Sequence, residues 1–109
     1  MNIITHAMSI IMDAGDARMD CVRALEALKQ WNFTDAENFL KTAKEKIVSA
    51  HVKQTQVIQL ESAGEIPDYS ILFTHAQDTL MTVDSEIELV EHLMELYKNI
   101  DTRFQAFEK

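Results

Sequence analysis

Residues that interrupt helices and residues that cross-link chains are both scarce in this sequence. Its 109 residues include two glycines, one proline and one cysteine. Because glycine and proline destabilise helix interiors and mark turns, so few of them predict long helices joined by few turns. The single cysteine, Cys21, has no partner for an intrachain disulfide, which fits a reducing compartment.

Basic side chains and long apolar runs are also lacking. Ten lysines and arginines stand against 18 acidic residues, so the formal net charge is −8. This balance disfavours nucleic acid and anionic membrane surfaces, which both attract basic proteins. No apolar run approaches the roughly 18 residues of a membrane span, and the amino terminus has no basic leader. We therefore expect a cytoplasmic protein with no direct membrane insertion, built as one domain over residues 1–109.

Apolar residues recur every three or four positions in the first part of the chain, which predicts a helix over about 3–30. Its apolar face is formed by Ile4, Ala7, Ile11, Ala14, Cys21, Leu25 and Leu28. Arg18 interrupts this face, and either its charged end reaches water or it pairs with an acid on another helix. Gly15 in mid-helix costs about 1 kcal/mol relative to alanine, and a close helix contact there would explain its presence.

A second helix is predicted over about 34–61. Thr34 and Glu37 have the spacing of a capping box, in which each side chain bonds to the amide of the other residue. The apolar face then consists of Ala36, Leu40, Ala43, Ile47, Ala50 and Val57. Gln54 lies on the same face, where a buried amide needs a hydrogen-bond partner. Gly64 follows the helix and is a common stop signal.

The third helix is predicted over about 68–106, with Pro67 before it and Asp68 as its N-cap. One apolar row comprises Phe73, Ala76, Leu80, Val83, Ile87, Val90, Met94 and Tyr97. A second comprises Leu89, Leu93, Leu96, Ile100 and then Phe104 or Phe107. Two rows indicate cover from two sides, and in a three-helix protein the second cover must come from another subunit. A single wide core face is the alternative. The predicted fold is all-α, an antiparallel three-helix bundle that assembles as a trimer.

His75 and Asp78 are the candidate functional residues of the third helix. Because they are three positions apart, both side chains lie on one face, about one turn from each other. An imidazole can accept and release a group near neutral pH, and a carboxylate can orient it or bind a hard metal ion. Surface helices carry such pairs routinely, so the spacing alone is weak support. Gln77 and Thr79 lie beside them and can hydrogen-bond phosphate oxygens.

Four short motifs occur in a familiar order: Ala14-Gly15-Asp16-Ala17-Arg18, Ala50-His51-Val52-Lys53-Gln54-Thr55, His75-Ala76-Gln77-Asp78 and Glu95-Leu96-Tyr97-Lys98. With them the chain resembles, over nearly its whole length, the lactose/cellobiose-specific IIA component of the bacterial phosphoenolpyruvate-dependent sugar phosphotransferase system. The resemblance implies a three-helix bundle that forms a homotrimer in the cytoplasm. It also implies a phosphoryl carrier, which takes its group from the phosphocarrier protein HPr and passes it to a cysteine of the IIB component during sugar uptake.

The resemblance assigns roles to three residues. The phosphoryl-accepting histidine of the family falls on His75, its axial metal-binding aspartate falls on Asp78, and Gln77 takes a supporting position at the phosphate site. Three Asp78 carboxylates that meet at a trimer axis would repel one another unless some are protonated or they bind a hard cation such as Mg²⁺. Many members carry a second histidine directly after the aspartate, where this chain has Thr79.

Two other functions remain open from the sequence. A non-catalytic relative could keep the fold as an adaptor or regulatory oligomer, and a two-component phosphotransfer bundle also uses an exposed helical histidine. The retained His75 and Asp78 favour the phosphoryl carrier. Among the other histidines, His51 either lines the site or has a structural role.

Overall fold

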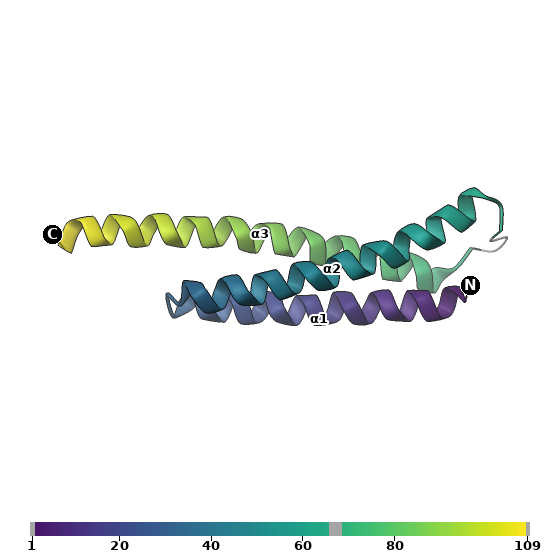
Figure 1. Ribbon diagram of the computed structural model, residues 1–109, viewed down its shortest axis with the longest axis horizontal. Helices are drawn as coiled ribbons and strands as arrows, with labels where there is room; N and C mark the ends of the chain where they lie inside the picture. Colours follow the sequence, from purple (N-terminus) through teal and green to yellow (C-terminus); the bar gives the residue numbers. More distant parts are fainter. Residues whose placement is uncertain (1, 66–68, 109) are drawn as a thin grey trace.

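The computed structural model describes residues 2–65 and 69–108, and this part of the chain forms three helices. They are α1 (Ile3–Lys29), α2 (Phe33–Ser62) and α3 (Ile71–Glu108). Figure 1 shows α1 and α2 side by side and antiparallel, with α3 lying along them. Since the described residues contain no strand, the predicted all-α three-helix bundle is confirmed. A search of the described helices for a segment long and apolar enough to cross a bilayer finds none.

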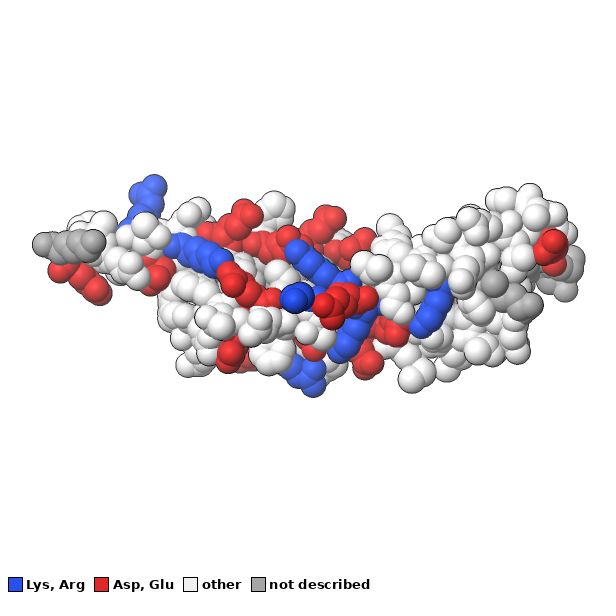
Figure 2. Space-filling view, in the orientation of Figure 1, with Lys and Arg blue, Asp and Glu red and all other residues white. Residues whose placement is uncertain are grey.

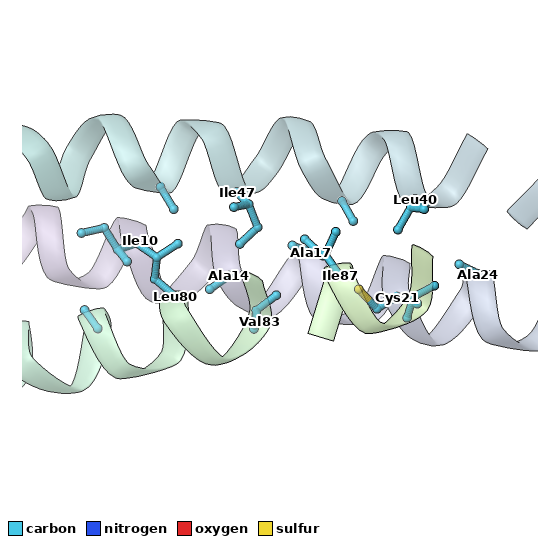
Figure 3. Packing of buried hydrophobic residues seen from close by; sticks show 14 of the residues in the cluster. Ile10, Ala14, Ala17, Cys21, Ala24, Leu40, Ile47, Leu80, Val83 and Ile87 are labelled. Carbon is cyan, nitrogen blue, oxygen red and sulfur yellow. The ribbon is translucent and has the colours of Figure 1, made fainter. Parts of the chain in front are cut away.

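Alanine forms much of the interior between α1 and α2. Seven alanines of these two helices are fully buried: Ala7, Ala14, Ala17, Ala24, Ala36, Ala43 and Ala50. Small side chains let two helix axes approach closely, and the larger Ile10, Leu28 and Leu80 fill the remaining space. Figure 3 shows side chains from all three helices, among them Ile10, Ile47 and Val83, in this shared core.

The two apolar rows of α3 have different surroundings. Seven residues of the first row, from Phe73 to Met94, are buried in the core of the chain. In the second row Leu89 is 59% exposed and Leu96 is 53% exposed, while Leu93 packs partly against the core. The alternative of a single wide core face is therefore wrong, because most of the second row lies outside the core.

One end of α3 projects beyond the rest of the molecule. The molecule is a rod with extents of 66 × 19 × 18 Å. In Figure 1 the carboxyl-terminal end of α3 runs past the turn that joins α1 to α2. On these last turns Phe104 is 62% exposed and Phe107 is 90% exposed. Among the described residues, these last turns of α3 therefore extend beyond the apolar core.

The turn between α1 and α2 is held by backbone hydrogen bonds and by aromatic rings. Trp31 has a φ of 58°, and its amide donates to the carbonyl of Leu28 at 2.9 Å, while the amide of Asn32 donates to Ala27 at 2.9 Å. This is the pattern of a helix stop that usually employs glycine, because other residues are strained at positive φ. The Trp31 ring lies 5.1 Å from the Tyr97 ring, centroid to centroid, and this contact offsets part of the strain.

The start of α2 differs from the predicted capping box. Asn32 is the N-cap: its Oδ1 accepts from the amide of Asp35 at 3.1 Å, and its Nδ2 donates to Asp35 Oδ2 at 2.8 Å. The box between Thr34 and Glu37 is therefore wrong. The preceding turn already delivers Asn32 to the first helical turn, two residues before Thr34, and Glu37 instead forms an ion pair with Lys98 of α3.

Glycine ends α2 as the sequence predicted. Gly64 has a φ of 76°, and the following amide, of Glu65, donates to the carbonyl of Leu60 at 3.0 Å. The predicted N-cap of α3, Asp68, lies outside the described residues. The helix itself begins at Ile71, three residues later than predicted, and the Ser70 hydroxyl accepts from the Phe73 amide at 3.1 Å.

Ion pairs join the helices around the core. Arg18 of α1 binds both carboxylate oxygens of Glu86 on α3, at 3.1 and 3.2 Å, so this arginine is paired.

The prediction of a close helix contact at Gly15 is wrong for the single chain. Gly15 is exposed, and a methyl group added there would meet no atom within 4 Å.

Candidate functional site

His75 stands on the outer face of α3, one turn after the helix begins at Ile71. Both His75 and Asp78 are exposed, and Ala76 between them is completely buried. Ala76 marks the side of α3 that faces the core. His75 and Asp78 are three residues apart and share a face on the other side of the helix. The structure therefore presents the imidazole and the carboxylate together to any partner that approaches this end of α3.

The surroundings of His75 are only partly apolar. Phe73 and Leu80 belong to the core, at 6% and 0% exposure, whereas Met81 is 53% exposed and Ile71 is 78% exposed. On the face seen in Figure 2, charged side chains crowd the middle of the rod, and fewer lie at the end where α3 begins. On this face, the end of the rod where α3 begins is therefore largely uncharged.

Gln77 is the residue near His75 with a defined hydrogen bond across the helices. Its Oε1 accepts from Nε2 of Gln54 on α2 at 3.0 Å, and its side chain is half-buried. This bond holds the side chain of Gln77 against α2. Thr79 forms its hydrogen bond within α3 instead, since its hydroxyl donates to the backbone carbonyl of His75 at 2.9 Å.

The bond to Gln77 belongs to a longer chain of contacts. Nδ1 of His51 lies 3.3 Å from Oε1 of Gln54, and Nε2 of the same ring lies 3.3 Å from Oδ2 of Asp84 on α3. The chain thus runs from Asp84 through His51 and Gln54 to Gln77. It supplies the partner that Gln54 was expected to need, and it connects His51 to the residues beside His75.

Sequence reasoning did not connect Asp84 with this site. The spacing of His51 and Gln54, three residues apart on one helix, was the available signal for a contact between those two. Asp84 follows Gln77 by two turns on α3, so the two lie on one side of that helix. Only the register of α2 against α3 places both opposite the His51 and Gln54 pair.

A metal site needs several ligands, which acidic, histidine and cysteine side chains supply. Among the described residues, no group of three or more histidine, cysteine, aspartate or glutamate side chains could hold an ion. Asp78 contributes one exposed carboxylate, and its oxygens are of the type that Mg²⁺ prefers. One carboxylate is fewer ligands than a protein-bound Mg²⁺ site usually has, so Asp78 by itself supplies only part of such a site.

The structure is thus a rod of three helices that carries a histidine on an open helix surface. A family described as "PTS system, Lactose/Cellobiose specific IIA subunit" matches residues 5–98 of the chain. The lactose-specific EIIA component of Staphylococcus epidermidis is 44% identical over 89 residues, which cover 82% of this chain and 86% of that protein. The chain belongs to the lactose/cellobiose-specific IIA family of the sugar phosphotransferase system.

Solved structures agree with this family. The crystal structure of the cellobiose-specific enzyme IIA from Bacillus anthracis is 34% identical, with a TM-score of 0.87 and 94% of each chain covered. A solution structure of a IIA(chitobiose)–HPr complex from Escherichia coli contains a chain that is 28% identical, with a TM-score of 0.81. The matched region covers 93% of this chain and 98% of the chain in that complex. Family members that are named for different sugars therefore share this fold.

Proposed function

We propose that this protein is a phosphoryl carrier that accepts a phosphoryl group from HPr on His75 and passes it to a IIB component during sugar uptake. The observation that carries the proposal is the exposed imidazole of His75 on α3, within the helical segment that also contains Gln77 and Asp78. The complex of HPr with the chitobiose-specific relative supports HPr as the donor.

Transfer between two proteins demands positioning more than covalent machinery. The lone pair of a neutral imidazole nitrogen on His75 forms the new bond to phosphorus while the bond between phosphorus and the donor breaks. In the second step a IIB thiolate takes the phosphoryl group, and the imidazole returns to its starting form. The amino group of Gln77 can donate to a phosphoryl oxygen in both steps, because such oxygens accept hydrogen bonds.

Exposure of His75 suits this order of events. Donor and acceptor must reach the same nitrogen in turn, so a deep pocket would exclude one of two partners with different shapes. We place the carrier in the cytoplasm, where HPr and a IIB thiol in its reduced form would meet it.

We also propose a homotrimer in which Asp78 from each copy faces a shared axis and binds Mg²⁺ or a similar cation. Exposure of Asp78, together with the open second apolar row of α3, supports this arrangement. The carboxylates would hold the ion, which would neutralise their mutual repulsion close to His75.

Incubation with enzyme I, HPr and phosphoenolpyruvate tests the carrier function. The wild-type chain should gain one phosphoryl group that is labile in acid and stable in base, and His75→Ala should gain none while its helical content is unchanged. His92→Ala is the matched control, since His92 is an exposed histidine on the same helix, and it should be phosphorylated normally. Labelling that persists in His75→Ala would overturn the assignment. An unlabelled wild-type chain would favour a non-catalytic adaptor.

A further inference from the structure

We propose that the end of the rod around His75 is the docking surface for HPr, and that Ile71 is its central apolar contact. The inference rests on the proposed function, because it takes HPr as the donor of the phosphoryl group. It adds the residues that bind the donor and the kind of force that holds it there.

Three segments of the sequence lack charged side chains. Residues 2–12, 54–60 and 69–77 contain no lysine, arginine, aspartate or glutamate, although 26% of the whole chain is charged. One segment lies in each of α1 and α2, and the third contains the start of α3. We call the surface that they form together the uncharged end.

The structure brings these three segments together. His6 Nε2 of α1 lies 3.2 Å from Gln56 Oε1 of α2, and Gln54 of α2 donates to Gln77 of α3 at 3.0 Å. Figure 1 shows the amino-terminal end of α1 beside the start of α3. Among the described residues, Glu61 is the acid that lines the hollow between the helices here. This end of the rod is therefore joined by uncharged hydrogen bonds, whereas ion pairs join its middle.

Several large apolar side chains of the uncharged end are exposed. Ile71 and Tyr69 are each 78% exposed, more than any other large apolar residue of this end. The full set is Ile4, Met8, Met12, Ile58, Tyr69 and Ile71. A gathering of exposed apolar side chains without charges is typical of a surface that binds another protein, since the centre of such an interface is depleted of charge.

Ile71 is the apolar neighbour of His75 on the exposed side of α3. It precedes His75 by four residues, so the two Cβ atoms lie about 5–6 Å apart on one face of the helix. A specific protein interface covers about 800 Å² on each partner. A donor that brings its phosphorus in line with a nitrogen of His75 must therefore cover Ile71 as well, near the centre of the contact, where apolar side chains contribute most.

A transient partner explains this surface better than a second copy of the chain. A copy packed permanently on Ile71 would also cover His75 and keep the donor away from it. Asp78, proposed to face the other copies, lies on the other side of His75 along α3. The exposed part of the second apolar row begins at Leu89, 14 residues after His75 and about 21 Å along the helix. Ile71 thus remains for the donor.

The kinetics of phosphoryl uptake from phosphorylated HPr test the role of Ile71. In Ile71→Ser the donor concentration that gives half the maximal rate should rise about tenfold, because the complex no longer buries a large apolar side chain. The rate at saturating donor should stay within about twofold of wild type, since the reacting atoms are unchanged. Ile71→Leu keeps an apolar side chain of the same size and should behave as the wild-type chain does.

Phe107→Ser is the matched control. It also removes a large, exposed apolar side chain from α3, but 32 residues after His75, about 48 Å along the helix, so uptake should be unchanged. An Ile71→Ser chain that the donor saturates as readily as it saturates wild type would overturn the proposal. Loss of self-association in Ile71→Ser, seen by sedimentation, would also overturn it, because the surface would then belong to another copy.

Phosphoramidate separates docking from chemistry. The bond between its phosphorus and nitrogen breaks while the His75 nitrogen bonds to phosphorus, and ammonia leaves, so this small donor needs no docking surface. It should phosphorylate Ile71→Ser as fast as the wild-type chain. If Ile71→Ser slows transfer from phosphoramidate as much as transfer from HPr, Ile71 acts on His75 itself and the docking role is wrong.

Salt tests which force holds the donor. Salt screens attraction between exposed charges but not apolar contacts, so an increase from about 0.05 to 0.5 M NaCl should raise the half-saturating donor concentration less than about threefold. A larger increase would show that charges hold the complex, and would overturn the apolar docking surface.

An NMR titration with unphosphorylated HPr keeps the two proposals apart. Amide signals of residues 54–60 and 69–77 should shift as HPr is added, and Ile71→Ser should need about tenfold more HPr for the same shift. If HPr passes no phosphoryl group to the wild-type chain, the proposed function fails, but these shifts would still establish the docking surface. Shifts confined to other parts of the rod would refute it.

Discussion

Asp20 is a buried acid whose charge is balanced by two cations. Its side chain is 5% exposed, and its two oxygens bind Lys46 of α2 at 2.7 Å and Arg23 of α1 at 3.1 Å. Burial of a carboxylate is costly unless such partners are present. The pair with Lys46 also sets the register of α1 against α2, because it joins residues that are 26 positions apart.

Replacement of Asp20 by alanine should destabilise the fold. The change leaves the Lys46 ammonium without its partner and removes hydrogen bonds to a charged group, so we expect the free energy of unfolding to fall by about 2–3 kcal/mol. Urea denaturation measures this quantity. Glu26→Ala, which removes an exposed pair with Lys29, is the control and should change it by less than about 1 kcal/mol. Equal effects of both variants would show that burial of Asp20 is energetically unimportant.

Cys21 should make stability depend on alkaline pH. Burial raises the pKa of its thiol from 9.0 to about 11, and the nearby carboxylates of Glu86 and Asp20 contribute. The folded state therefore favours the neutral thiol, and its contribution is complete below pH 9 and is lost as the pH rises toward 11. In urea titrations at pH 8 and pH 10.5, Cys21→Ala should lose less stability between the two values than the wild-type chain. An identical loss in both proteins would contradict the buried thiol.

At the level of single helices, Gly15 is a weak point in α1. It lies in mid-helix with an ordinary helical backbone, and a methyl group there would meet no atom within 4 Å. Gly15→Ala should raise the free energy of unfolding of a dissociated chain by about 0.5–1 kcal/mol, because alanine loses less backbone entropy. Urea denaturation at low protein concentration tests this. A variant that is less stable, or that no longer self-associates, would place Gly15 in a contact with another copy.

The positions of the helices were predictable, because a helix that is buried on one side has apolar residues every three or four positions. This spacing can be read directly from the sequence. The seven buried residues of α3 from Phe73 to Met94 are an example. Helix starts were less predictable. The cap at Asn32 depends on Trp31 adopting a positive φ, and its aromatic contact with Tyr97 comes from a distant part of the chain.

The candidate site could be predicted only in part for the same reason. His75, Gln77 and Asp78 are neighbours in sequence, so one motif contains them all. The contacts of His51 and Asp84 join α2 to α3 and depend on how these helices are aligned, which no local pattern records.

For the whole molecule, Leu96 tests whether α3 carries an interface between copies. Leu96 is 53% exposed, so Leu96→Asp should leave a single chain folded but bury an unpaired charge in any interface, at a cost of several kcal/mol. Sedimentation should show a trimer for the wild-type chain and monomers for the variant. Val48→Asp is the control, because Val48 is 63% exposed on α2. A wild-type chain that is monomeric at micromolar concentration would exclude the interface.

Asp78 gives a second test of the same assembly. Asp78→Leu should abolish the effect of Mg²⁺ on trimer stability, and it should keep the trimer intact in chelator because the repulsion between carboxylates is removed. Thermal unfolding with Mg²⁺ and with chelator, for both proteins, measures the difference. If neither Mg²⁺ nor chelator changes the thermal unfolding of the wild-type chain, the Asp78 carboxylates do not meet at an axis.

The projecting end of α3 also bears on the order in which the molecule folds. The α1–α2 hairpin joins residues close in sequence through a short turn, so it can form on the microsecond timescale and act as a nucleus. The last turns of α3 leave Phe104 and Phe107 exposed in the described part of the chain, and short unsupported helices are marginal in water. If the proposed trimer covers this segment, its completion awaits a collision between chains. Refolding should end in a bimolecular phase that slows on dilution, while the hairpin forms at a rate that dilution does not alter.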